Sequence, residues 1–364
     1  MITHPKDQIT LSQAAVTVAA AIIGIGIITM PRAGAEAVGT PDIWISTIIG
    51  GLIAIVVGYV IVKLSQKFPG KTFYEYSQLL TGSFLGRILG FFVIVYYTLL
   101  AAFEARAMAE VTRTYLMDQT PIEVTVIIFI SVGAYLVFGG INSIVRLFEL
   151  YFPVMAFFFF LIIALSVGNV ELDNLRPVLG QGIMPVAKGL EPMALSYLGV
   201  EVMLILTAFM KEPNKAQKAV FIGVSIMIIF YLAMIVTVIG ALTVTETKLL
   251  TWPTMELVKS IELKGFFFER FETFFIMLWI LTTYTTFVIS FYLAALGLSQ
   301  IFKQKINYFI YGLLPCMYIG AMYPENINSV FKLGDYLGYM DIVVAVIFPC
   351  VLWVAALVRR NRHE

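Results

Sequence analysis

The apolar segments of this chain are the feature that most constrains its fold. Of the 364 residues, 60% are hydrophobic and 13% charged, and the mean hydropathy is +0.91, more than a soluble core of this size needs. The sequence therefore predicts an all-α polytopic membrane protein that forms a single transmembrane domain over residues 1–364. Hydropathy predicts ten transmembrane helices, at residues 10–37, 42–66, 84–116, 121–139, 145–168, 183–210, 216–243, 268–301, 306–323 and 336–358.

Basic residues are distributed unevenly between the two sides that ten spans would define. With a cytoplasmic N-terminus, 14 of the 24 Lys and Arg residues fall on the inside and seven on the outside. The inside set is Lys6, Lys63, Lys67, Lys71, Arg87, Arg146, Lys211, Lys215, Lys218, Lys303, Lys305, Arg359, Arg360 and Arg362. The outside set is Arg113, Arg176, Lys188, Lys248, Lys259, Lys264 and Lys332. Because cytoplasmic loops are enriched in Lys and Arg, we predict that both termini are cytoplasmic. The first span has no small-residue cleavage site, so we expect it to be retained.

Several classes of function lack support in the sequence. The net charge of +1 argues against a nucleic-acid partner. The only histidines, His4 and His363, lie in the two tails, so no metal site is expected. The cysteines, Cys316 and Cys350, fall in apolar runs and do not indicate a disulfide framework. Phosphate-loop and nucleophile-elbow motifs are absent, so we expect neither an enzyme with catalytic residues nor a cofactor.

The first predicted span is interrupted at 24–32, GIGIITMPR. Gly24, Gly26 and Pro31 weaken a helix at a depth where unpaired backbone groups are costly. A broken helix would leave backbone groups around Ile25 free to bind the polar ends of a small ligand, and its second half would favour a carboxylate. The alternative is that the two glycines only let another helix approach closely, with Pro31 a tolerated kink.

The sixth predicted span is interrupted in the same way by Gly199 and Glu201. From Ile25 to Gly199 the separation is 199 − 25 = 174 residues, close to half of 364. Two broken helices in corresponding positions are typical of an inverted repeat with a midplane site. We predict a five-plus-five inverted repeat, with a first repeat over about 10–168 and a second over about 183–358. Glu201 would lie at the N-terminus of the second half-helix, where capping alone is an equal explanation.

The third span carries charges on two faces. Arg106, Glu110 and Arg113 share one stripe, which we interpret as a structural ion cluster. Glu104 lies on the other face, with Tyr97 and Leu100, and has no basic neighbour there. Intramembrane carboxylates are functional candidates by default, so we expect Glu104 to bind water, a proton or a cationic ligand group. The alternative is a protonated carboxyl group hydrogen-bonded to another helix.

The eighth span contains a cluster of hydroxyl groups. Thr282 and Thr286 share a stripe with Trp279 and Ser290, which would line a cavity or an ion site. The alternative is that these hydroxyls bond to carbonyls one turn earlier in their own helix. The fifth span has little polar content beyond Ser166 and no lysine, so an ion-coupling site is not demonstrated.

Several stretches together resemble the B subunits of bacterial spore germinant receptors, the spore-germination branch of the amino acid–polyamine–organocation transporter superfamily. They are 24–32 (GIGIITMPR), 103–110 (FEARAMAE), 176–182 (RPVLGQG), 198–204 (LGVEVML), 262–272 (ELKGFFFERFE), 285–289 (TTFVI) and 335–339 (DYLGY). The resemblance implies a LeuT-like inverted-repeat fold in the inner spore membrane. It also implies recognition of a small germinant, commonly an amino acid, together with an A subunit and a C lipoprotein.

By position, the resemblance places the ligand pocket on Gly24, Leu100, Leu198 and Thr286, with Glu104 important for signalling or a water path. Leu100 and Leu198 are the apolar walls from which ligand selectivity is expected. The full predicted ligand site is Gly24, Ile25, Gly26, Tyr97, Leu100, Glu104, Leu198, Gly199, Glu201, Thr282 and Thr286. Two functions stay open: a ligand sensor that signals to partner subunits, and a transporter that carries an amino acid with a proton or Na⁺.

Overall fold

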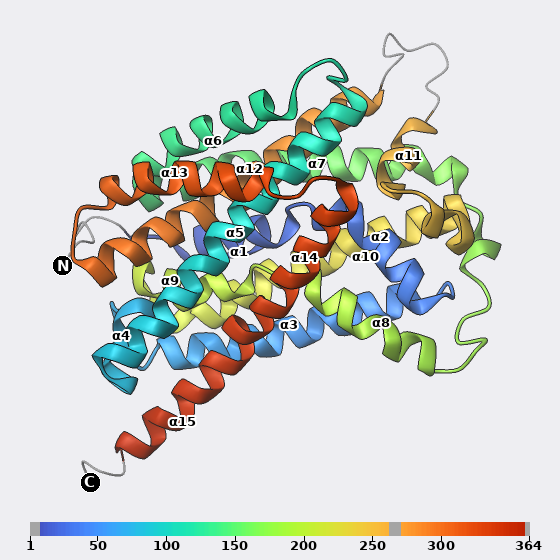
Figure 1. The fold of residues 1–364 in the computed structure, drawn as a ribbon. Coiled ribbons are helices and arrows are strands. Elements are labelled where there is room, and N and C mark those ends of the chain that lie inside the picture. Colours follow the sequence, from blue (N-terminus) through green and yellow to red (C-terminus); the bar gives the residue numbers. More distant parts are fainter. Residues whose placement is uncertain (1–7, 262–270, 361–364) are drawn as a thin grey trace.

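The structure is a computed structural model that describes residues 8–261 and 271–360 as a bundle of helices (Figure 1). The α-helices are α1 (Leu11–Ile23), α2 (Gly26–Val38), α3 (Ile43–Ser65), α4 (Phe73–Thr81), α5 (Ser83–Tyr115), α6 (Ile122–Phe138), α7 (Gly140–Ser166), α8 (Met184–Leu195), α9 (Met203–Leu206), α10 (Ala216–Leu249), α11 (Pro253–Lys259), α12 (Phe271–Phe302), α13 (Ile306–Met322), α14 (Ile327–Asp341) and α15 (Phe348–Arg360). Lys6, Lys264 and Arg362, the predicted span start at 268 and nearly all of the stretch 262–272 lie outside the described residues.

Short helices of the 3₁₀ and π types connect several of these elements. They are the 3₁₀ helices η1 (Val167–Asn169), η2 (Leu172–Leu175), η3 (Val200–Val202), η4 (Thr207–Phe209) and η5 (Pro213–Lys215), and the π-helix η6 (Ile342–Ile347). The π-helix joins α14 to α15, so the three form one long element. In Figure 1, α15 leaves the bundle at the same end as the start of α1, as expected for termini on one side.

The helices confirm a membrane-spanning fold. Across residues 8–261 and 271–360, six helical segments are long and apolar enough to cross a membrane, and two bent helix pairs bring the number to eight. The helices at the two remaining predicted spans, α6 and α13, are apolar but only 17 residues long each. The number of ten spans, the repeat boundaries and the cytoplasmic side of the termini stay predictions.

Both predicted helix breaks are present. The axes of α1 and α2 differ by 54°, with the break at Gly24 and Ile25, and the two halves of the sixth span differ by 43°. Gly199 has φ of 120°, a conformation that side chains disfavour. A Cβ at Gly199 would lie 2.6 Å from the carbonyl carbon of Ala21, so only glycine lets the two breaks meet.

Some predicted boundaries were wrong. The tenth span begins at Ile327 rather than near 336, because its polar first turns, with Asn328, Lys332 and Asp335, line a cavity instead of facing lipid. The fifth begins at Gly140 rather than near 145. The short helices α4 and α11 were not predicted, and they lie at opposite ends of the bundle (Figure 1).

Candidate ligand-binding site

A cavity of about 620 Å³ lies where the two helix breaks meet. Its wall is built by α1, α2, α5, α8, α12 and α14, together with the breaks that follow α1 and α8 and with Thr251. Six of the predicted site residues line it: Ile25, Gly26, Leu100, Glu104, Leu198 and Thr286. These residues come from the first, third, sixth and eighth predicted spans, so the fold brings together positions that are distant in sequence.

Glu104 is the cavity residue with unused hydrogen-bonding capacity. Its side chain is 3% exposed, and Oε1 accepts a long hydrogen bond of 3.5 Å from the backbone N–H of Ile25. Oε2 is buried and has no hydrogen-bond partner within the described part of the chain. An ionised carboxylate accepts several hydrogen bonds, so this oxygen is available to a donor in the cavity.

Gly24 allows this carboxylate to approach the helix break. A Cβ at position 24 would lie 2.5 Å from Glu104 Oε1 and 3.0 Å from Thr286 Oγ1. Gly24 does not itself line the cavity, but a larger residue there would push the carboxylate and the hydroxyl away. The glycine is therefore required for the close contact between α5, α12 and the first break.

The carbonyl groups freed at the end of α1 are largely taken by side chains. The Thr286 hydroxyl donates to Ala20 O at 3.0 Å, and Tyr231 Oη donates to Ile22 O at 2.9 Å. The Thr285 hydroxyl lies 3.0 Å from Ala20 O and 2.6 Å from Thr282 O of its own helix. The expectation that these carbonyls are free for a ligand was wrong, because α10 and α12 supply donors. Thr286 therefore reaches across to the first break and does not bond back within α12.

The N-terminus of α2 remains a polar feature of the cavity. Ile25 caps this helix without a side-chain hydrogen bond, and Ile25, Gly26 and Thr29 all line the cavity. A helix N-terminus carries partial positive charge and favours an anionic group such as a carboxylate. The cavity therefore places the N-terminus of α2 beside the carboxylate of Glu104.

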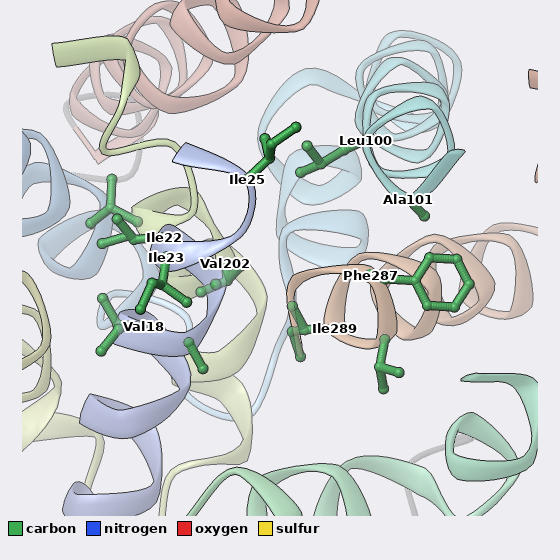
Figure 2. Packing of buried hydrophobic residues seen from close by; sticks show 14 of the residues in the cluster. Val18, Ile22, Ile23, Ile25, Leu100, Ala101, Val202, Phe287 and Ile289 are labelled. Carbon is green, nitrogen blue, oxygen red and sulfur yellow. The ribbon is translucent and has the colours of Figure 1, made fainter. Parts of the chain in front are cut away.

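Apolar side chains line the inner wall of the cavity next to these two features. Figure 2 shows the side chain of Ile25 extending from the break toward Leu100 of α5, while Ile22 and Ile23 lie on the other side of the turn. Leu198, just before Gly199, adds to this wall from the second break, and Leu195 and Phe103 also contribute. An apolar side chain of a ligand would contact these residues.

The outer end of the cavity is charged, and sequence reasoning missed it. Arg32 pairs with Glu36 at 2.9 Å, and its guanidinium lies 5.5 Å from the centre of the Phe331 ring. These contacts tie α2 to α14, where Lys332 and Asp335 also line the cavity. The available signal was the run of polar residues immediately before the predicted start of the tenth span.

Four predicted site residues lie away from the cavity wall. Tyr97 is fully buried, and Gly199 contacts the end of α1. Thr282 donates to Trp279 O at 2.7 Å within its own helix, which was the alternative considered for it. Glu201 is fully buried and accepts a hydrogen bond of 2.6 Å from Gly199 N, beside the break.

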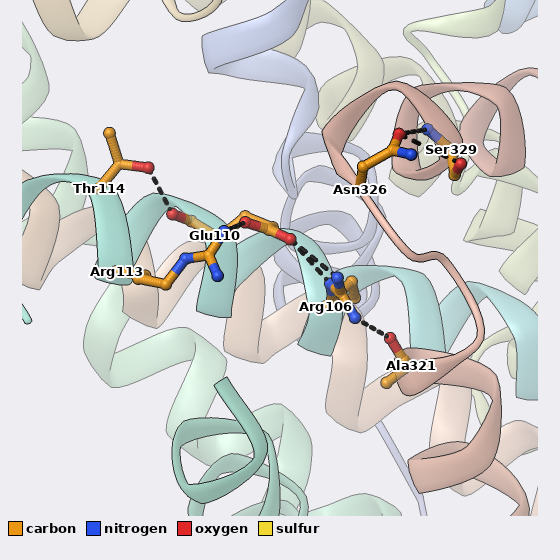
Figure 3. A network of polar contacts seen from close by, with 7 residues as sticks. All are labelled: Arg106, Glu110, Arg113, Thr114, Ala321, Asn326 and Ser329. Atoms are coloured by element: carbon orange, nitrogen blue, oxygen red, sulfur yellow. Dashed lines mark hydrogen bonds and ion pairs between the residues drawn. The ribbon is translucent and has the colours of Figure 1, made fainter. Parts of the chain in front are cut away.

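The charged stripe of α5 is a structural ion cluster, as predicted (Figure 3). Arg106 contacts Glu110 Oε1 at 2.9 Å, and Arg113 contacts Glu110 Oε2 at 2.9 Å. Arg106 also donates to Ala321 O at 3.1 Å, which anchors α5 to the end of α13. Both oxygens of Glu110 are therefore occupied by cations.

Comparison with known proteins agrees with the sequence and the fold. The chain is 41% identical over 360 residues to spore germination protein YndE of Bacillus subtilis (strain 168), covering 99% of both chains. It is 37% identical over 345 residues to spore germination protein A2 of the same strain, covering 94% of both.

Among solved structures, MhsT in complex with L-phenylalanine matches with a TM-score of 0.67 and 11% identity, covering 95% of this chain and 97% of that one. Mhp1, a nucleobase-cation-symport-1 family transporter, matches with a TM-score of 0.65 and 13% identity, covering 94% and 79%. These likenesses establish a LeuT-like fold. The model of the spore germination protein family matches residues 8–330. The chain therefore belongs to this family of integral, multi-pass membrane proteins, and a location in the inner spore membrane fits this membership.

Proposed function

We propose that this chain is the germinant-binding membrane subunit of a spore germination receptor. It binds a small nutrient, an amino acid, in the cavity at the two helix breaks, and it acts as a binding protein rather than an enzyme. The observation that carries the proposal is the buried, unpartnered Oε2 of Glu104 in that cavity. Burying a carboxylate oxygen without a hydrogen-bond donor costs free energy. The ammonium group of a ligand would supply donors and the opposite charge.

The rest of the cavity suits the other parts of an amino acid. The N-terminus of α2 would receive the carboxylate of the ligand. Ile25, Leu100 and Leu198 would contact its side chain. A likeness of fold also supports the proposal, since MhsT was solved with L-phenylalanine.

Ligand binding would be transmitted to partner subunits. We propose an A subunit and a C lipoprotein as partners, as the germinant receptor family implies. The cavity wall includes both halves of the first broken helix, the first half of the second and six residues of α14, so a ligand that closes it would move several elements together.

The second candidate is a proton- or sodium-coupled amino acid transporter. It is favoured by the likeness of fold to transporters, which include a Na⁺-coupled sialic acid symporter. The fold alone does not separate a sensor from a transporter.

The experiment is to reconstitute the purified chain in proteoliposomes and measure both binding and uptake of radiolabelled L-alanine, L-valine and L-leucine. Saturable binding without time-dependent accumulation is expected for a sensor. Accumulation driven by a proton or Na⁺ gradient would instead establish the transporter. Failure to bind any amino acid would contradict the proposed ligand class. Gly312→Ala is a matched control for protein quality, because that glycine has open space around it on α13.

A further inference from the structure

Two buried carboxyl groups outside the cavity contact the same tyrosine hydroxyl. Tyr96 Oη on α5 lies 3.1 Å from Glu201 Oε1 and 3.2 Å from Asp341 Oδ1. Tyr96 and Glu201 are fully buried, and Asp341 is 8% exposed. One hydroxyl is therefore within hydrogen-bond distance of both carboxyl groups.

The number of protons in this cluster does not match two ionised carboxylates. A tyrosine hydroxyl has one proton and donates it to one acceptor, while an ionised carboxylate has no proton to give. Oε2 of Glu201 accepts from Gly199 N, but that leaves one carboxyl–hydroxyl contact without a hydrogen. A proton on one of the two carboxyl groups completes the set of bonds.

No cation replaces this proton among the residues that the structure describes. Lys, Arg and His side chains all lie beyond 4 Å from Glu201 and Asp341 in the described chain. Lys63 of α3 lies over the ring of Tyr59, and Lys67, just after α3, lies over the ring of Trp353. A third His, Cys, Asp or Glu that would complete a metal site is also missing from the described part of the chain.

The other titratable groups around the pair are tyrosines. Tyr74 and Tyr76 of α4 make their hydrogen bonds with Leu293 O and Ser65 Oγ. Tyr97 interacts electrostatically with both carboxyl groups, and its hydroxyl is fully buried without a partner within the described residues. The Tyr97 hydroxyl therefore makes none of the hydrogen bonds that link the pair within the described chain.

The two carboxyl groups lie at junctions between helical segments. Glu201 is in η3, directly after the break of the sixth span, and Asp341 is the last residue of α14 before the π-helix η6. Each follows a cavity residue by three positions, Leu198 and Gly338 respectively. π-helical turns are frequent at functional sites. A change at the cavity is therefore one turn away from both carboxyl groups.

We propose that Glu201 and Asp341 share one proton through Tyr96, forming a proton-binding site that joins the second half of the sixth span to the tenth span. With the proton present, the two segments are held together by hydrogen bonds. Without it, two negative charges face each other in a buried place, and the segments separate. The site is distinct from the cavity and does not depend on the identity of the ligand.

Infrared spectroscopy of the purified chain in nanodiscs tests this directly. The Glu104→Gln background removes the buried carboxyl group of the cavity, and no ligand is added. We expect the C=O stretch of a protonated carboxylic acid, sensitive to exchange into D₂O. The band should be lost or shifted in Glu201→Gln and in Asp341→Asn. An absent band in the background protein, or one unchanged in both variants, would overturn the proposal.

Adjacent tyrosines provide a matched pair that keeps the test informative if the carboxyl variants do not fold. Tyr96→Phe removes the hydroxyl between the two carboxyl groups and should shift the band. Tyr97→Phe makes the same change at the next residue, which has no hydrogen bond to lose, and should leave the band in place. A band that is unchanged in Tyr96→Phe, or that shifts equally in both variants, would contradict a proton shared through Tyr96.

Discussion

Two glutamates on α5 are almost equally buried and differ in what surrounds them. Glu104 is 3% exposed and Glu110 is 4% exposed. Both oxygens of Glu110 contact arginines, whereas Glu104 lines the cavity and one of its oxygens has no partner among the described residues. The comparison teaches that burial alone does not identify a functional carboxylate. Spare hydrogen-bonding capacity beside a cavity distinguishes Glu104 from a residue that stabilises the fold.

The largest effect is expected on stability, from Glu110→Ala. The substitution leaves Arg106 buried at 4% exposure without its partner, and removing one member of a buried pair costs about 3–5 kcal/mol. We expect the free energy of unfolding to fall by this amount, measured by denaturant titration in detergent micelles.

The matched control is Glu212→Ala, which removes one member of the exposed Glu212–Lys215 pair. Exposed pairs contribute about 0–1 kcal/mol, so this variant should unfold almost like the parent. Equal losses in the two variants would mean that the α5 cluster has no special structural role.

An intermediate effect is expected from Gly24→Ala, which pushes on Glu104 without changing its charge. The new Cβ would lie 2.5 Å from Oε1, and such overpacking costs about 1–3 kcal/mol. We expect both a lower free energy of unfolding and weaker binding of the amino acid. Gly312→Ala, with open space around the glycine, is the control. Normal ligand affinity in Gly24→Ala would show that the position of Glu104 at the break is unimportant.

An effect of similar size, but on ligand binding alone, is expected from Leu198→Ala. Removing methylene groups from an apolar pocket changes the free energy that discriminates between ligands by about 1–3 kcal/mol, which is roughly 10- to 200-fold in preference. We expect weaker binding of the native ligand and a shift of preference from alanine toward valine and leucine. A dose-response series of germination with alanine, valine and leucine, on spores with matched receptor levels, measures both changes. If every half-maximal concentration moved by the same factor, Leu198 would act through stability or signalling.

The sequence was sufficient for features that depend on local chemistry. Gly24, Gly26 and Gly199 within apolar runs predicted both breaks, and the helical spacing of Arg106, Glu110 and Arg113 predicted their pairing. Contacts between distant helices were not predictable, since hydropathy does not say which faces meet. The donation from Thr286 to Ala20 O and the meeting of Glu201 with Asp341 both depend on such contacts.

The central claim is that Glu104 recognises the ammonium group of the ligand, and binding to Glu104→Gln tests it most directly. Isothermal titration compares the tightest-binding amino acid among L-alanine, L-valine and L-leucine with its 2-hydroxy acid analogue, on the parent and the variant. A hydrogen bond to a charged group is worth about 1.5–3 kcal/mol, so the amino acid should lose roughly 10- to 150-fold in affinity. The hydroxy acid, whose hydroxyl donates a hydrogen bond but carries no positive charge, should lose less affinity than the amino acid. An amino acid that binds Glu104→Gln as tightly as the parent would contradict the claim, and so would equal losses for the two ligands.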